Sequence, residues 1–339
     1  MEGGEAKRSR DEAVRAWREL TGGPEVRDHA RPTLVAISGG ADSSALLISL
    51  ASAEGAKIVA AYIGHGLRSA DEDRADVEAV TSLCERLGVP MIERHIRVDR
   101  SENLESSARE ERYRALEQIA VSQGCRYVAT GHHSGDQLET MLMALTRGAG
   151  LAGLVGMVPS RDLGQGVRLI RPMLGLDRVA CEQICNAYGY GPRHDPTNDD
   201  LSRRRAWLRA VVAPIIENTP GLGSRLSTTS RLLRDAQEVV AMRVEALVDR
   251  AEVSPGSVSI PVGLLEGETG LVVGGVLRRL ACTISPEGSD QRGWKHLRPI
   301  IAAIQSGDGL ERRFDLCGMS VHVVDKHIVI RRSPIAKEL

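Results

Sequence analysis

Short apolar runs alternate with amphipathic stretches over the first two-thirds of the chain. The apolar runs are short enough to be buried strands, and they are Leu34–Ile37, Ile58–Ile63, Met91–Ile96, Tyr127–Thr130 and Leu169–Arg171. Helical periodicity fills the intervals, at about Ser44–Ala53, Glu72–Leu87, Glu105–Gln123 and Asp136–Leu145. This alternation predicts an α/β fold, a doubly wound and mostly parallel sheet that binds its ligands at the carboxyl ends of the strands.

The pattern changes between Pro214 and Pro220, after two more predicted helices at Arg178–Tyr188 and about Leu201–Val212. A long helical stretch, Leu222–Val248, follows, and then strands alternate irregularly with helices. The predicted strands are Val258–Pro261, Arg313–Leu316, Ser320–Val324 and His327–Arg332, and the predicted helices lie near Leu264–Leu280 and Trp294–Gln305. We therefore expect a first domain at residues 1–216, with residues 1–30 as an N-terminal extension, and a smaller α+β domain at residues 217–339.

Composition narrows the class of protein. The chain has 339 residues, 42% of them hydrophobic, which is enough for two domains with sizeable cores. It has no apolar run of membrane-spanning length, and its charged first 20 residues do not resemble a secretory signal. Six scattered cysteines form no disulfide-like framework, so we expect a cytoplasmic protein. The net charge of −1 excludes a globally basic nucleic-acid binder, although only five of the 44 basic residues are lysines. The guanidinium group of arginine can donate paired hydrogen bonds to phosphate oxygens, so this excess of arginine is compatible with a phosphate-containing ligand.

The strongest chemical signal follows the first apolar run. Ser38, Gly39, Gly40, Ala41, Asp42 and Ser43 form a strand-to-helix turn rich in glycine and hydroxyl groups. Such a turn directs backbone amides and the positive end of a helix dipole at its occupant, which suits a phosphate. No lysine follows the glycines, so the turn is not the phosphate loop of common NTPases. A simple capped helix start is the alternative.

A second strand-to-helix turn runs from Gly131 to Thr140. Asp136 and Glu139 are three residues apart, so they share one face of the first helical turn and could hold Mg²⁺ or a cationic substrate. Helix capping alone would also explain acidic residues there. His132 and His133 precede them, but the spacing matches no standard zinc pattern.

Several basic residues are further candidates. Arg109 and Arg112 can face one ligand from a helix, although a surface ion pair between Glu105 and Arg109 is equally consistent with the spacing. His65 lies two residues after the second predicted strand and could contact a nucleotide or carry a proton.

A basic run lies farther along the chain. Arg205 and Arg209 flank Trp207, a pattern that suits RNA but also an ordinary solvated helix face. The glycine-rich segment Arg147–Met157 could shape a pocket or form a mobile loop.

The turn SGGxDS resembles the pyrophosphate loop (PP-loop) of the N-type ATP pyrophosphatases. From about Leu34 to Pro214 the chain carries, in order, SGGxDS, HGLR, NLExxAR..RY, GHHxxDQxET, RGxGLxGLxGM, RPML and DPTN. This series resembles the tRNA(Ile)-lysidine synthetase family. The resemblance implies that ATP adenylates the carbon-2 carbonyl oxygen of the wobble cytidine in a CAU-anticodon isoleucine tRNA. The ε-amine of free L-lysine then displaces AMP, which gives lysidine.

The resemblance also implies roles for individual residues. Residues 38–43 and His65 would bind ATP, and Asp42 and Asp136 would lie near Mg²⁺. The implied catalytic residues are Asp42, His132, Asp136, Glu139, Arg109 and Arg112, with the general base left open among His132, Asp136 and Glu139. Arg147, Arg171, Arg205, Arg209 and the C-terminal domain would bind tRNA, and the resemblance allows a homodimer.

Some features depart from the family pattern, and rival functions exist. Gly64, Ala206 and His194 replace residues usual in the family, which affects contacts on the tRNA-facing side.

A related sulfur-transferring tRNA 2-thiocytidine synthetase should carry CxxC pairs, but the closest cysteines here, Cys181 and Cys185, have a different spacing. A non-catalytic ATP-binding protein would not need the acidic and basic residues of the later turns.

Overall fold

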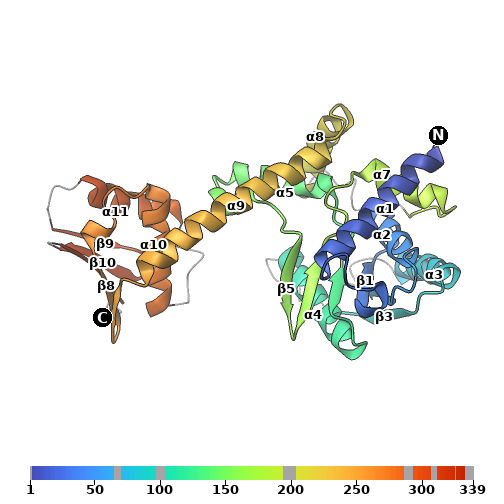
Figure 1. Cartoon of the computed structure of the whole chain (residues 1–339), viewed down its shortest axis with the longest axis horizontal. Coiled ribbons are helices and arrows are strands. Elements are labelled where there is room, and N and C mark those ends of the chain that lie inside the picture. The colour runs from blue at the N-terminus through green and yellow to red at the C-terminus, as the bar shows by residue number, and fades with distance from the viewer. Residues whose placement is uncertain are drawn as a thin grey trace. The chain divides into compact units, whose positions relative to one another are not determined.

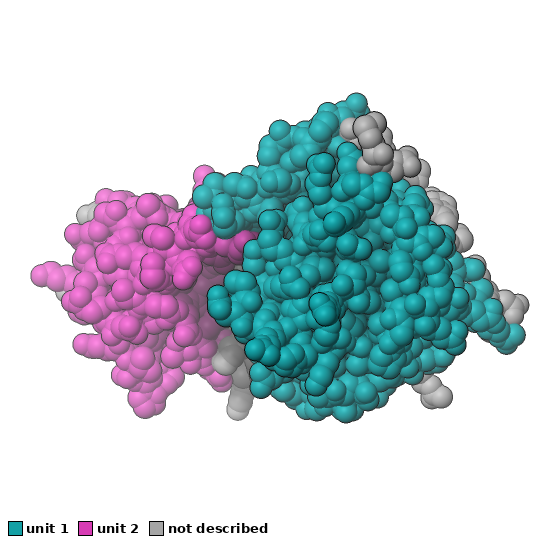
Figure 2. All heavy atoms as spheres, turned by 45° about the vertical axis from the view of Figure 1, so that its right-hand side comes forward, with its two compact units in different colours: residues 1–233 teal, residues 234–339 magenta. Residues whose placement is uncertain are grey.

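The chain forms two compact units, residues 1–233 and residues 234–339, which Figure 2 colours separately. The computed structural model describes residues 2–64, 70–96, 104–193, 204–285, 293–306, 311–324 and 326–332. The expected domain boundary at 216/217 falls at the last residue of helix α8 (Arg204–Glu217), before helix α9 (Leu222–Val248), and these domain limits stay a prediction.

A six-stranded sheet with the order β3-β2-β1-β4-β6-β5 forms the centre of the first unit (Figure 1). Its strands are β1 (Thr33–Ile37), β2 (Ile58–Gly64), β3 (Met91–His95), β4 (Tyr127–Ala129), β5 (Ser160–Gly164) and β6 (Val167–Ile170). Strand β1 pairs in parallel with β2 on one side and β4 on the other, and only β5 runs antiparallel to its neighbour β6. The predicted doubly wound, mostly parallel sheet is confirmed.

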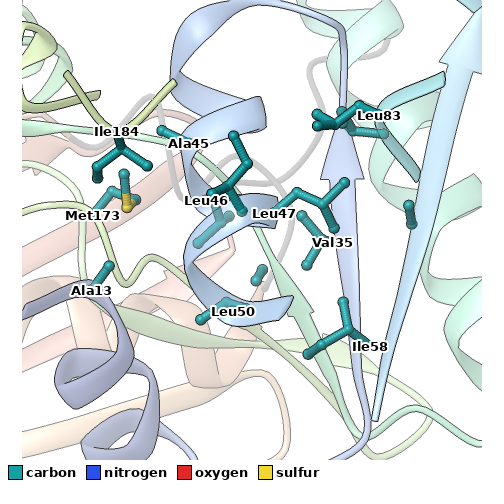
Figure 3. Close-up of a cluster of buried hydrophobic side chains, with 14 of the residues drawn as sticks. Ala13, Val35, Ala45, Leu46, Leu47, Leu50, Ile58, Leu83, Met173 and Ile184 are labelled. Atoms are coloured by element: carbon teal, nitrogen blue, oxygen red, sulfur yellow. The ribbon is translucent and has the colours of Figure 1, made fainter. Parts of the chain in front are cut away.

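The central strands of this sheet are buried on both faces. Successive residues of a strand point to opposite sides, and each side packs against its own helices. Leu34 of β1 joins a cluster with helix α4, whereas Val35 joins a second cluster with helix α2. Figure 3 shows the second cluster, with Leu47 of α2 beside Val35. The helices of this unit are α1 (Glu2–Leu20), α2 (Ala41–Ala51), α3 (Ala70–Leu87), α4 (Leu104–Ser122), α5 (Ser134–Thr146), α6 (Leu151–Leu154), α7 (Arg178–Ala187) and α8, with a 3₁₀ turn at Asp28–Ala30.

Helix α1 is an element that the hydrophobic pattern does not predict. Ala13 and Trp17 lie fully buried in the cluster that also holds α2. The indole Nε1 of Trp17 donates a hydrogen bond of 3.0 Å to Oγ1 of Thr33, and the Arg31 guanidinium lies 5.2 Å from the indole ring centre. The residues expected as a polar extension therefore form part of the first core.

The second unit has its own core, formed by the C-terminal part of α9, two further helices and an antiparallel sheet of order β7-β8-β11-β10-β9. The elements are β7 (Glu252–Ser254), β8 (Ser257–Pro261), a 3₁₀ turn (Val262–Leu264), α10 (Gly270–Ile284), α11 (Trp294–Ser306), β9 (Arg312–Asp315), β10 (Met319–Val324) and β11 (His327–Arg332). The predicted α+β character is confirmed. Across the described residues of both units, no helix has the length and apolar character needed to span a bilayer.

Candidate active site

The ligand-binding edge of the sheet lies where the strand order reverses. Strand β1 continues into α2 and β4 into α5, and these neighbouring strands end at the same edge. Open α/β sheets bind their ligands in such a crevice. A cavity of about 220 Å³ lies here, and its walls are Ala36, Ile37, Ser38, Asp42, Ala61, Ile63, Arg112, Leu116, Thr130, Gly131, His132 and Asp136. The first and second glycine turns thus open into one cavity.

The turn between β1 and α2 is held by its own hydroxyl groups. Gly39 has a φ of +84°, a left-handed conformation that favours glycine. The amide of Ser38 donates to Oγ of Ser43 over 3.1 Å, and that hydroxyl lies 3.2 Å from the Gly40 carbonyl oxygen, to which it donates. The first turn of a helix leaves amide N–H groups without helical acceptors, so this rigid turn offers donors to a phosphate.

Gly131 brings the second turn against the first. A Cβ atom at Gly131 would lie 2.8 Å from the carbonyl carbon and oxygen of Asp42 and 2.8 Å from the amide nitrogen of Ser43. No side chain fits between these backbones. The absence of a Cβ atom therefore sets how closely the two turns approach.

His133 links the acidic residues of the two turns. It is the N-cap of α5: its Nδ1 accepts from the amide of Gly135, and its own amide donates to Asp136, each over 3.0 Å. In a neutral imidazole this arrangement puts the proton on Nε2. Nε2 lies 3.7 Å from the carboxylate of Asp42 and 3.7 Å from that of Asp136. The sequence pattern singles out His132 and not His133, although the three-residue spacing from His133 to Asp136 is that of a capping box.

His132 lines the cavity as a neutral side chain. Its Nδ1 lies 2.8 Å from Oγ1 of Thr130. Burial lowers the pKa of His132 to about 3; the Asp136 carboxylate opposes this shift, and three nearby arginines add to it. So low a pKa disfavours His132 as the general base for an amine.

Asp42 and Asp136 are the residues best placed for a metal ion. Among the described residues, no three histidine, cysteine or acidic side chains gather as a metal site. Mg²⁺, however, commonly uses one or two protein carboxylates and takes its other oxygens from substrate phosphates and water. Two carboxylates beside a phosphate-binding turn fit that pattern. Glu139, one turn farther along α5, is buried.

Arginines gather around one tyrosine beside this cavity. The guanidinium carbons of Arg109 and Arg112 lie 5.3 and 5.5 Å from the ring centre of Tyr113. Arg161, on β5, lies 4.9 Å from the same ring centre. The buried Arg171, just after β6, donates to the carbonyl of Val158 over 2.6 Å. Arg109, Arg112 and Arg171 are predicted from the sequence, whereas Arg161 is not.

Comparison with known proteins identifies the family. A profile described as a PP-loop domain matches residues 12–216. The tRNA(Ile)-lysidine synthase of Salinispora arenicola is 39% identical over 255 residues, covering 73% of this chain and 72% of that protein. The chain belongs to the tRNA(Ile)-lysidine synthase family. The enzyme of that name from Bordetella bronchiseptica is 36% identical over 64% of this chain and 65% of its own length.

A solved structure shares the fold of this lysidine synthase family member. The U34-tRNA thiolase NcsA from Methanococcus maripaludis, described with its [4Fe-4S] cluster, has a TM-score of 0.55 and 17% identity. The match covers 68% of this chain and 79% of that one. Here Cys181 and Cys185 lie buried in α7, and Cys185 Sγ donates to the Ala41 carbonyl over 3.4 Å. Burial raises the pKa of Cys185 to about 12 and that of Cys181 well above its usual value, so both are packing thiols rather than cluster ligands.

The remaining predicted site residues lie away from the cavity or outside the description. Arg147 is exposed at the C-cap of α5. It lies 11 residues beyond Asp136 along that helix, which corresponds to about 16 Å. His65 lies outside the described residues. Arg205 and Arg209 belong to α8, but their side chains are also outside the description.

Proposed function

We propose that this protein ligates free L-lysine to carbon 2 of the wobble cytidine in CAU-anticodon tRNA(Ile), with ATP and Mg²⁺ as co-reactants. The observation that carries the proposal is the contact at Gly131, since it joins the phosphate-type turn and the acidic turn at one cavity. Relatives named tRNA(Ile)-lysidine synthase support the choice of substrate and product.

In the proposed first step, residues 38–43 hold the β- and γ-phosphates of ATP through backbone amides and the hydroxyls of Ser38 and Ser43. Asp42 and Asp136 would hold Mg²⁺, which offsets phosphate charge when bound. The carbon-2 oxygen of cytidine attacks the α-phosphorus, the bond to the β-phosphate oxygen breaks, and pyrophosphate leaves. Arg109 and Arg112 stabilise the negative charge that shifts during this transfer.

In the proposed second step, the neutral ε-amine of lysine attacks carbon 2. The carbon–oxygen bond breaks, AMP leaves with the former carbonyl oxygen, and the nitrogen loses a proton. Asp136 and Glu139 are the candidates for binding the ammonium group and accepting the proton, because the low pKa of His132 disfavours it as the base.

The proposed tRNA-binding residues are Arg147, Arg171, Arg205 and Arg209, together with the α+β unit. Arg171 is the best supported, since it lies in the arginine group beside the cavity. A cytoplasmic location and a homodimer are further parts of the proposal.

Incorporation of labelled lysine tests the proposal. Purified protein is incubated with ATP, Mg²⁺, radiolabelled lysine and unmodified CAU-anticodon tRNA(Ile). Label should enter this tRNA, should require ATP, and should be absent with a CAU-anticodon methionine tRNA and with the Asp42→Asn variant. ATP turnover on another substrate, without label in this tRNA, would contradict the proposal.

A further inference from the structure

The antiparallel direction of β5 brings Arg161 to the ligand-binding edge of the sheet. Ser160 pairs with Ile170 and Arg161 with Leu169, so β5 begins where β6 ends. The amide of Arg171 donates to the Pro159 carbonyl over 2.8 Å, which fixes the two strand ends together. Residues 161 and 171, ten positions apart, thus meet beside α4, which Figure 1 labels next to β5.

This edge of the sheet concentrates arginine side chains. Around Tyr113 stand Arg161 from β5 and Arg109 from α4, and Arg171 also acts electrostatically on this tyrosine. Within the part of the chain that the structure describes, no carboxylate lies at ion-pair distance from Arg109, Arg161 or Arg171.

Arg171 is the most telling member of the group. It is only 4% exposed, and no described group accepts a hydrogen bond from its buried Nε. A buried guanidinium among like charges is costly unless an anion completes the site. The arrangement therefore favours an anionic ligand.

We infer that Arg161, together with Arg171, binds a backbone phosphate of the RNA substrate and so positions the wobble nucleotide at the cavity. This inference rests on the proposed function. Guanidinium groups bind phosphate oxygens through paired hydrogen bonds, and such contacts set the register of a nucleic acid on a protein.

The position of the group in the sheet favours RNA phosphate over the phosphates of ATP. Strand β5 lies three places from β1 in the order β1-β4-β6-β5. Neighbouring strands are about 4.8 Å apart, so Arg161 starts about 14 Å from the strand that carries the phosphate-binding turn. The β- and γ-phosphates of ATP have their own donors at residues 38–43, and Arg109 and Arg112 are assigned to the transferred phosphoryl group. Arg161 and Arg171 are therefore left for the second substrate.

Substitution of Arg161 in the full-length protein tests the inference. Affinities for CAU-anticodon tRNA(Ile) are measured over a series of KCl concentrations, and affinity for ATP is measured separately. Arg161→Gln should weaken tRNA binding about tenfold and reduce the slope of log K against log salt by about 0.7 to 1. ATP affinity should not change. Arg161→Lys should recover the salt slope and only part of the affinity, because lysine keeps the charge but not the fork.

Arg126→Gln is the matched control. Arg126 is exposed just before β4, at the opposite edge of the same sheet, so the same loss of charge there should change neither affinity. Unchanged tRNA binding by a folded Arg161→Gln variant would overturn the inference, and so would weaker ATP binding with normal tRNA binding. If instead the wild type fails to incorporate lysine, the proposed function itself is wrong.

Discussion

Gly131 is the residue at which the turn after β4 touches the turn after β1. The atoms that a Cβ would meet belong to the backbone of Asp42 and Ser43, so they cannot rotate away as a flexible side chain can. The start of α2 or the end of β4 would have to move instead. At this position the size of one residue controls the geometry of the whole cavity.

Gly131→Ala should therefore separate the turns. We expect a loss of about 1 to 3 kcal/mol in the free energy of unfolding from overpacking. We also expect ATP affinity to fall markedly, as measured by calorimetric titration. Gly191→Ala is the control, since no atom lies within 4 Å of a Cβ built there. Equal behaviour of the two variants would refute the role of Gly131.

His133 combines a structural role and a chemical role that substitution can separate. In His133→Asn the new side-chain oxygen can still accept from Gly135, but nothing replaces the imidazole Nε2 between Asp42 and Asp136. Lysine incorporation should fall about 10- to 100-fold in both His133→Asn and His133→Ala, as for groups that orient active-site ligands. Only His133→Ala should lose about 1 kcal/mol of stability with its helix cap. Full activity in His133→Asn would show that the histidine is only a cap.

His132 should make the free energy of unfolding fall as the pH is lowered. Its pKa is about 3 in the folded protein, below the usual value near 6.5. Between these values the unfolded chain binds a proton that the folded protein does not, so stability is present above pH 6.5 and is lost as the pH falls. Denaturant titrations from neutral to mildly acidic pH should show a steeper loss for the wild type than for His132→Gln. The difference should approach 1.4 kcal/mol per pH unit, as an order of magnitude; parallel curves would contradict it.

Among the elements, α1 shows how a mostly polar sequence can belong to a core. Its apolar contribution comes from a few positions on one face, including Ala13, Val14 and Trp17. Trp17 is fully buried and makes a hydrogen bond to the first residue of β1, Thr33. The helix therefore supports the strand that leads into the turn at residues 38–43, to which we assign phosphate binding.

Trp17→Ala should cost about 3 to 5 kcal/mol in the free energy of unfolding, as large aromatic truncations in cores do. Trp207→Ala is the control for stability, because the Trp207 side chain is 53% exposed on α8. Chemical denaturation with circular dichroism provides the measurement. Similar losses in the two variants would mean that α1 contributes little to the core.

The strands also show which parts of the fold can be predicted from the hydrophobic pattern of the sequence. The central strands are predicted well because burial on both faces leaves near-continuous apolar runs such as residues 34–37. Strand β5 is not predicted, since Ser160–Gly164 is short, polar and only partly buried at the sheet edge. Arg161 is missed with it, because its place beside Tyr113 depends on a pairing between β5 and β6 that no local pattern reveals. His133 is missed for a similar reason, since its neighbour Asp42 lies about 90 residues away in the sequence.

For the whole molecule, the local distribution of charged side chains says more about anion binding than the net charge does. The net charge is −1, yet guanidinium groups gather at the carboxyl-terminal edge of the sheet, where anions are expected to bind. Each of the two units, which Figure 2 colours separately, has its own hydrophobic core. The chemistry proposed here is assigned to the first unit, and the second is assigned to tRNA binding.

The fate of one oxygen atom tests the central claim most directly. A CAU-anticodon tRNA(Ile) is prepared with oxygen-18 at the carbon-2 carbonyl of the wobble cytidine and is incubated with the protein, ATP, Mg²⁺ and lysine. If the cavity activates this oxygen with ATP, mass spectrometry should find oxygen-18 in the phosphate of the released AMP, in proportion to the lysidine formed. Unlabelled AMP, or formation of ADP in its place, would contradict the account.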